Sequence, residues 1–257
     1  MNYFTYPYIY MGGGVSVGDI NNDNLDDIFF TGNMAENRLY LNNGNLEFDD
    51  ITSLAGVGGD DKWYTGSTMV DINNDGWLDL YVCGFESPNK LYINYEGKFE
   101  EQAKSYGLDF KGASVMMAFA DYDNDGDLDA YLLTNRVNMS KDSVMANLIK
   151  DERGNLKVKE KFKELGYFLD RPGNIPVLIN AGQYDYLYKN ENGYFVDVTV
   201  ESGIGKNPYY GLSATWWDYN DDGRPDLYVA NDFMGPDHLF QNLGLDSNGV
   251  IKFKDVV

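Results

Sequence analysis

The sequence of 257 residues has little cysteine or histidine. Its single cysteine, Cys83, excludes an internal disulfide and lies in the strand-like run DLYVCGF, which predicts a small buried core residue rather than a reactive thiol. Its single histidine, His238, lies in GPDHLF, where a role in packing or hydrogen bonding is expected. A serine–histidine pair stays open from sequence, but nothing else resembles a nucleophile site. We therefore predict no catalytic residue and no enzymatic activity.

Positive charge is also scarce. The chain has 20 Lys and Arg against 41 Asp and Glu, a formal net charge of −21. Binding to nucleic acid or to an anionic membrane needs a basic surface, so neither is expected, whereas bound cations are compatible with this charge. No run approaches the ~18 apolar residues of a membrane span, so no transmembrane segment is predicted. The opening MNYFTYPYIY lacks the basic start and apolar middle of a signal peptide.

The chain does contain a repeat. An acidic stretch begins at Asp19, Asp71, Asp121 and Asp218, and each copy leads into a short apolar run. Around each copy the sequence reads as four short strands separated by turn residues. Four-stranded units at a period of about fifty residues are typical of β-propeller blades. A solenoid would have shorter repeats, and a sandwich would not explain the internal similarity.

We therefore predict an all-β fold, a β-propeller with four visible blades at about 12–59, 60–111, 112–207 and 208–257. The last repeat stops after its fourth strand, so a fragment of a larger propeller is an open interpretation. The third blade carries an insertion at about 135–183, which is locally basic and has weak helical patterning. A solvated excursion and a loop that contacts a ligand or partner both fit this insertion.

The acidic stretches are nine-residue loops at 19–27, 71–79, 121–129 and 218–226, named here the first to fourth loops. Positions 1, 3, 5 and 9 are always Asp or Asn, while position 7 varies and would contribute only its backbone carbonyl. The predicted metal ligands at positions 1, 3, 5, 7 and 9 are Asp19, Asn21, Asp23, Leu25 and Asp27; Asp71, Asn73, Asp75, Trp77 and Asp79; Asp121, Asp123, Asp125, Asp127 and Asp129; and Asp218, Asn220, Asp222, Arg224 and Asp226.

Calcium fits these loops best. It takes about six to eight oxygen ligands, and Gly or Asn at position 6 permits the positive φ of a sharp turn. Magnesium demands stricter geometry, and zinc prefers His or Cys, which the loops lack. Acidic turns without metal would leave clustered carboxylates repelling one another. An EF-hand needs Glu at position 12 and a following helix, whereas these loops lead into strands. We predict up to four calcium ions, each between the first and second strands of a blade.

The DxNxDGxxD-type loops at this period resemble FG-GAP/VCBS repeats, the calcium-carrying blades of integrin α-subunit propellers. The runs GDINNDNLDDIFFTGN, NRLYLNNG, RPGN and DLYVANDF resemble the bacterial relatives of cartilage acidic protein. The resemblance covers nearly the whole chain. It implies a calcium-stabilised extracellular, cell-surface or periplasmic propeller that acts in adhesion or recognition. Asn24 departs from the usual Gly, which implies a weaker first site.

Alternating strands place the calcium loops at one end of each blade, and the insertion and the interblade segments at the other. Aromatic residues in those segments would stack on sugars or anchor a protein, or would pack between blades; they are Tyr6, Tyr8, Trp63, Tyr64, Tyr209 and Tyr210. We thus expect a non-catalytic adhesion or recognition module with a protein or glycan ligand. A carbohydrate-binding or carbohydrate-active propeller is the alternative, and a purely structural spacer is a third.

Overall fold

The fold consists of antiparallel four-stranded units in chain order. The computed structural model describes residues 12–136, 147–160, 166–171, 175–206, 208–232 and 235–257. The first two units comprise β1 (Val15–Gly18), β2 (Asp27–Phe30), β3 (Arg38–Asn42) and β4 (Phe48–Asp50), then β5 (Trp63–Val70), β6 (Asp79–Pro88), β7 (Lys90–Tyr95) and β8 (Lys98–Glu101). The other two comprise β9 (Lys111–Ala120), β10 (Asp129–Thr134), β15 (Tyr186–Glu191) and β16 (Tyr194–Asp197), then β17 (Gly211–Trp217), β18 (Asp226–Asn231), β19 (His238–Leu245) and β20 (Ile251–Asp255).

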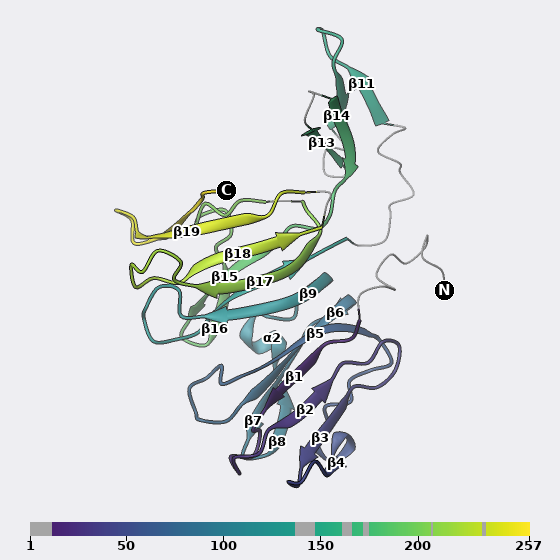
Figure 1. Cartoon of the computed structure of the whole chain (residues 1–257), viewed down its shortest axis with the longest axis vertical. Coiled ribbons are helices and arrows are strands. Elements are labelled where there is room, and N and C mark those ends of the chain that lie inside the picture. The colour runs from purple at the N-terminus through teal and green to yellow at the C-terminus, as the bar shows by residue number, and fades with distance from the viewer. Residues whose placement is uncertain (1–11, 137–146, 161–165, 172–174, 207, 233–234) are drawn as a thin grey trace.

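The first strands of the four units, β1, β5, β9 and β17, follow one another through the molecule (Figure 1). Hydrogen bonds connect them across the units. Gly14 N donates to Thr65 O at 2.6 Å, Thr65 Oγ1 donates to Ser114 O at 2.7 Å, and Trp216 Nε1 donates to Ala118 O at 3.1 Å. The all-β, propeller-type fold predicted from the repeats is therefore confirmed.

The second and third units share one sheet. β6 extends to Pro88, and its end pairs with the start of β9 at Phe85 opposite Ala113 and at Pro88 opposite Lys111. The resulting strand order is β16-β15-β10-β9-β6-β7-β8, with β5 on β6. The central pair of units is thus held by backbone hydrogen bonds as well as by side-chain packing.

Apolar side chains fill the space between consecutive units. Phe29 and Leu39 of the first unit, for example, pack against Leu80, Val82 and Tyr92 of the second. Similar clusters lie between the second and third units and between the third and fourth. Fully burying one such side chain contributes about 1.5–3 kcal/mol, so these clusters stabilise the stack of sheets. Cys83 lies in the second of these clusters, fully buried, as predicted.

The two outer sheets expose positions that the inner sheets bury. Phe30 of the first unit is 41% exposed, whereas the equivalent Val82 of the second is 0% exposed. Likewise Tyr219 of the fourth unit is 38% exposed and the equivalent Tyr122 is 1% exposed. The repeat therefore dictates the same apolar pattern in every unit, and the neighbouring unit decides whether it is buried.

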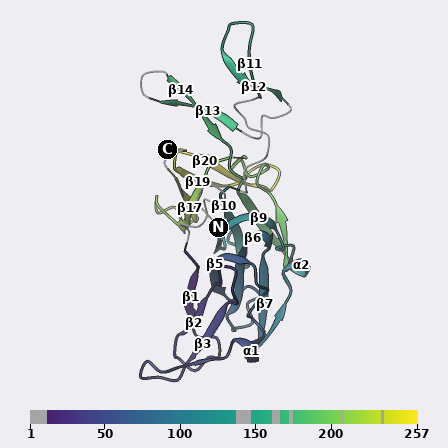
Figure 2. The ribbon, with the colours of Figure 1, turned by 90° about the vertical axis from the view of Figure 1, so that its right-hand side faces the viewer.

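The insertion lies between β10 and β15, as predicted, and its weakly helical stretches lie partly outside the described residues. Its described part contains two hairpins, β11 (Leu148–Lys150) with β12 (Leu156–Val158) and β13 (Gly166–Arg171) with β14 (Ile175–Asn180). Both project beyond the fourth unit (Figures 1 and 2). In the first hairpin the Asp151 carboxylate accepts the N–H groups of Arg153 and Asn155, each at 2.9 Å. This turn chemistry favours the hairpin of β11 and β12.

The helices are single turns that follow the fourth strands. They are α1 (Thr52–Ala55) and α2 (Ala103–Tyr106), and each ends at a glycine in the left-handed region, Gly56 or Gly107. Among the described residues, no helix has the length and apolar character needed to cross a membrane.

Candidate metal centres

Each acidic loop joins the first and second strands of its unit, as predicted. The loops connect β1 to β2, β5 to β6, β9 to β10 and β17 to β18, and they gather along one side of the stack (Figure 1). The insertion joins the opposite ends of β10 and β15, because Leu132 pairs with Tyr186 there while Asp129 bonds to Asn190 at the loop end. The loops thus lie together, away from the hairpins.

The carboxylate at position 1 closes each loop. One oxygen accepts the N–H of position 5 at 3.0–3.1 Å and the other accepts the N–H of position 6 at 2.6–3.0 Å, in all four loops. Position 6 has a positive φ in every loop, 69° at Asn24 and 81–96° at the three glycines. The loop conformation is therefore set by residues that the repeat preserves.

The carboxylate at position 9 is buried and accepts hydrogen bonds from two segments of the chain. It accepts the N–H of position 2 at 3.0–3.3 Å. It also accepts the N–H of an asparagine on the third strand at 2.7–2.8 Å, from Asn42, Asn94, Asn190 and Asn242. The side chain of this asparagine donates to the carbonyl of position 8 at 2.9–3.2 Å and accepts a glycine N–H from the next turn.

Sequence reasoning missed this third-strand asparagine. Its signal was present, because an asparagine precedes the turn in NRLYLNNG, NKLYINYEG, DYLYKNENG and DHLFQNLG. In two units it also reaches the preceding unit. Asn94 Nδ2 donates to Ile20 O and Asn242 Nδ2 donates to Tyr122 O, both at 2.8 Å. It is therefore a positioning residue both for the loop and for the contact between units.

Consecutive loops are also bonded directly to one another. The asparagine at position 4 donates to the carbonyl of position 6 in the next loop. The bonds are Asn22 to Gly76 at 3.1 Å, Asn74 to Gly126 at 3.1 Å and Asn124 to Gly223 at 3.3 Å. The position-4 residues all have a positive φ of 57–59°. The four loops thus form a continuous row.

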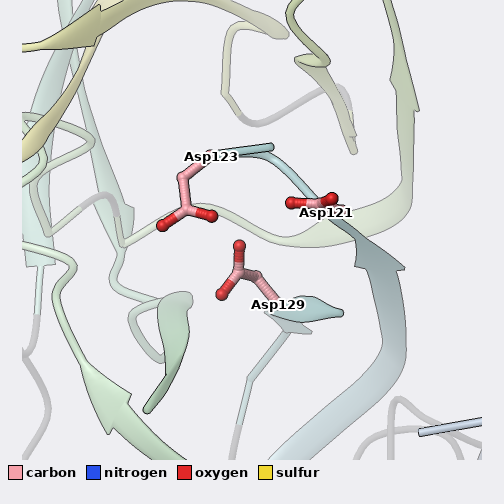
Figure 3. A group of neighbouring side chains, drawn as sticks. All are labelled: Asp121, Asp123 and Asp129. Carbon is pink, nitrogen blue, oxygen red and sulfur yellow. The ribbon is translucent and has the colours of Figure 1, made fainter. Parts of the chain in front are cut away.

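In the third loop the acidic side chains converge. One oxygen each from Asp121, Asp123 and Asp129 lies within 4.8 Å of the others (Figure 3). The first, second and fourth loops have Asn at position 3, and its amide donates to the position-5 carboxylate at 2.9 Å. In the third loop position 3 is Asp123, which has no such donor. Its carboxylate instead bonds the ammonium of Lys189.

Burial raises the pKa of the position-9 carboxyls. Burial, together with the negative charges of Asp75 and Asp71, raises the pKa of Asp79 to about 6. Burial, together with the negative charges of Asp123 and Asp125, raises the pKa of Asp129 to about 8. The pKa of Asp27 and Asp226 is raised by burial as well. A carboxylate that resists ionisation in the bare protein is one that an added cation would stabilise strongly.

The residues present fit a hard cation. All sixteen side chains predicted at positions 1, 3, 5 and 9 lie within their compact loops, and all are oxygen donors. One carboxylate oxygen in the third loop, Asp123 Oδ1, is buried and has no hydrogen-bond partner within the described residues. Metal binding by the backbone carbonyl of position 7 stays a prediction for Leu25, Trp77, Asp127 and Arg224. The loops contain no His or Cys, the residues that supply nitrogen and sulfur ligands in zinc sites.

Of the aromatic residues considered as ligand contacts, Trp63, Tyr64 and Tyr210 are buried. Their burial fits the alternative that they pack between units. Tyr209 stacks on His238 with ring centroids 5.3 Å apart. Tyr6 and Tyr8 lie outside the described residues.

His238 is itself buried, and its Nδ1 lies 2.7 Å from Asp255 Oδ2, which fits the expected role in packing and hydrogen bonding.

Comparison with known proteins identifies the repeat. Residues 19–82 and 71–132 each match the profile of FG-GAP-like repeats. Residues 19–132 of this chain thus contain FG-GAP-like repeats. It is 28% identical to cartilage acidic protein 1 of Mus musculus over 153 residues, which is 58% of this chain and 24% of the relative. It is 32% identical to the Xenopus tropicalis protein of the same name over 128 residues, 48% of this chain and 20% of that relative.

This chain thus matches only a fifth to a quarter of the length of these relatives. Among solved structures, it is similar to an Agrocybe aegerita lectin that recognises non-reducing terminal N-acetylglucosamine, with a TM-score of 0.38 and 16% identity over 95% of this chain and 65% of the lectin. It is also similar to the V. cholerae biofilm matrix protein Bap1, with a TM-score of 0.36 and 14% identity over 95% of this chain and 37% of Bap1.

Proposed function

We propose that this chain is a calcium-binding, non-catalytic repeat protein that acts outside the cell in adhesion or recognition. The observation that supports the proposal most is the fourfold recurrence of one donor arrangement. In each loop positions 1 and 9 are held by the same backbone groups, and in the third loop the acidic side chains converge. Oxygen-only donors in a tight loop suit calcium better than magnesium or zinc.

In this proposal, calcium supplies the positive charge that lets the crowded carboxylates ionise. The chain's own residues do the rest. Asp71 and its equivalents close the loop, Asp79 and its equivalents join it to the sheet, and Asn94 holds Asp79. Extracellular calcium modules bind at about 10⁻⁴–10⁻³ M, so about 1 mM calcium would add about 0.4–1.4 kcal/mol per site. Sites this weak would be filled outside the cell and empty in the cytosol.

The burial of Trp63, Tyr64 and Tyr210 counts against the carbohydrate alternative. A protein ligand for the exposed side of the stack is therefore the better proposal. A glycan array combined with a reducing-sugar assay separates the two. Binding without turnover would favour a lectin, and release of sugar ends would contradict a non-catalytic role.

Calorimetric titration with calcium tests the metal assignment. We expect up to four equivalents to bind to the whole chain. Asp71→Asn removes one charge from the second loop and should remove or weaken one equivalent. The control is Asp61→Asn, an exposed acidic residue outside the loops, which should leave the titration unchanged. Heats of injection equal to those of buffer alone would contradict the proposal.

A further inference from the structure

One of the four loops has a basic side chain of the third strand among its acidic residues. Lys189 of β15 bonds Asp123 Oδ2 and lies 3.8 Å from Asp125 Oδ2. It directly precedes the third-strand asparagine, Asn190. The other units place uncharged residues there, namely Leu41, Ile93 and Gln241. The lysine is thus particular to the third unit and is not a feature of the repeat.

The third loop, which contacts Lys189, also has more acidic side chains than the other loops. Positions 1, 3, 5, 7 and 9 of the third loop are all Asp, whereas the second loop has Asp only at positions 1, 5 and 9. The extra carboxylate nearest the lysine, Asp123, has a side chain only 4% exposed. An isolated charge so well buried costs several kcal/mol unless an opposite charge lies beside it. Lys189 supplies that charge, since it is the cation that contacts Asp123 among the described residues.

We propose that Lys189 is a built-in counter-ion of the third loop, which holds that loop together without a divalent ion and weakens its binding of calcium. The inference rests on the proposed calcium function. Two physical effects support it. The ammonium neutralises part of the charge that would attract the ion, and it occupies one oxygen of the position-3 ligand. A lysine side chain has an ordinary pKa of about 10.4, so its ammonium is charged at neutral pH.

The fourth loop offers a contrast. There Arg224, at position 7, contacts Asp222 at position 5, and the Asp222 side chain is 25% exposed. The position-3 residue of that loop is Asn220, whose amide bonds Asp222 as in the first two loops. The arginine thus lies on a water-exposed carboxylate, where its charge is screened. Only Lys189 pairs with a buried position-3 carboxylate.

The test compares Lys189→Met with the wild type by thermal unfolding and by calcium titration. In chelator, the variant should melt about 2–6 °C lower, because it leaves Asp123 without its cation. With calcium present, this deficit should shrink, and one site should bind calcium about tenfold more tightly or better, the effect expected of one unit charge removed from a few ångström away. Lys254→Met, an exposed lysine of β20, is the matched control and should change neither quantity.

The outcomes are separable. Equal melting of Lys189→Met and wild type in chelator would overturn the counter-ion role, whatever calcium does. An unchanged or weaker calcium affinity in the variant would overturn the tuning of the third site. If neither protein binds calcium at all, the proposed function fails, while the chelator melt still decides whether Lys189 stabilises the loop. Lys189→Gln, which copies Gln241, should give the same result and excludes an effect of the methionine side chain.

Discussion

The second and third loops share one backbone conformation and differ in how their charges are balanced. In both, the position-1 carboxylate accepts two backbone N–H groups, and position 9 bonds the third-strand asparagine. The second loop has three carboxylates and an amide, Asn73, at position 3. The third has five carboxylates and recruits Lys189. Loop geometry is therefore a property of the repeat, whereas electrostatics is a property of the individual unit.

The largest expected effect concerns the asparagines that hold position 9. Asn94→Ala should destabilise the protein by about 2–4 kcal/mol, because it leaves Ile20 O, Leu78 O and the Gly97 N–H without their bonds. Asn190→Ala should cost less, since the Asn190 amide donates to Leu128 O within its own unit. Chemical denaturation in chelator measures both. Equal losses would show that the bond from Asn94 to the preceding unit contributes nothing.

A second difference between the loops should appear in how the stability of the protein depends on pH. Burial raises the pKa of Asp79 to about 6 and of Asp129 to about 8, both above the unfolded value near 4. The folded state thus holds these protons longer than the unfolded state, so stability in chelator falls as pH rises from about 4 to 8. Burial also raises the pKa of Asp185 to about 7, so the fall between pH 7 and 8 belongs to Asp129, with a slope of at most about 1.4 kcal/mol per pH unit.

Asp129→Asn isolates this contribution. The variant should lose the fall in stability between pH 7 and 8, while Asp79→Asn should keep that fall and lose part of the fall below pH 6. Denaturation midpoints measured in chelator at several pH values provide the readout. A stability that stays flat from pH 7 to 8 in the wild type would contradict the raised pKa of Asp129.

The smallest expected effect concerns the bond between the two loops. Asn74→Gly removes the donor to Gly126 O while keeping a residue suited to the positive φ of 57°. We expect a loss of about 0.5–1.5 kcal/mol, typical of one hydrogen bond at an accessible site. Asp221→Gly in the fourth loop has the same backbone change, and the matched pair separates the hydrogen bond from the flexibility of glycine. Equal losses in the two variants would assign the whole effect to glycine.

The sequence predicted the elements that recur and missed those that depend on a neighbour. The period and the strand pattern located each loop between its first two strands, because turn residues and alternating apolar residues act locally. The asparagine equivalent to Asn94 recurs visibly in every unit, but its role was missed because its bonds join residues that are distant in sequence. The same holds for Lys189, which is separated from Asp123 by 66 residues and by the insertion.

The hairpins of the insertion were not predicted for a related reason. Its apolar spacing was weak, and the Asp151 turn brings β11 and β12 together as a hairpin. The role of the aromatic residues stayed open because sequence alone does not distinguish a residue on an exposed rim from one packed between units. Trp63 illustrates this: it is buried in a cluster with Phe85 of its own unit and Ala113 of the third unit.

Thermal unfolding of the whole chain in millimolar calcium and then in excess chelator tests most directly whether the clustered oxygens hold divalent ions. At about 1 mM calcium, four sites of the expected affinity would add about 1.6–5.6 kcal/mol in all, which raises the midpoint by several degrees. The same increase should be absent with magnesium at that concentration. A midpoint that moves by less than a degree or two between calcium and chelator would contradict the account.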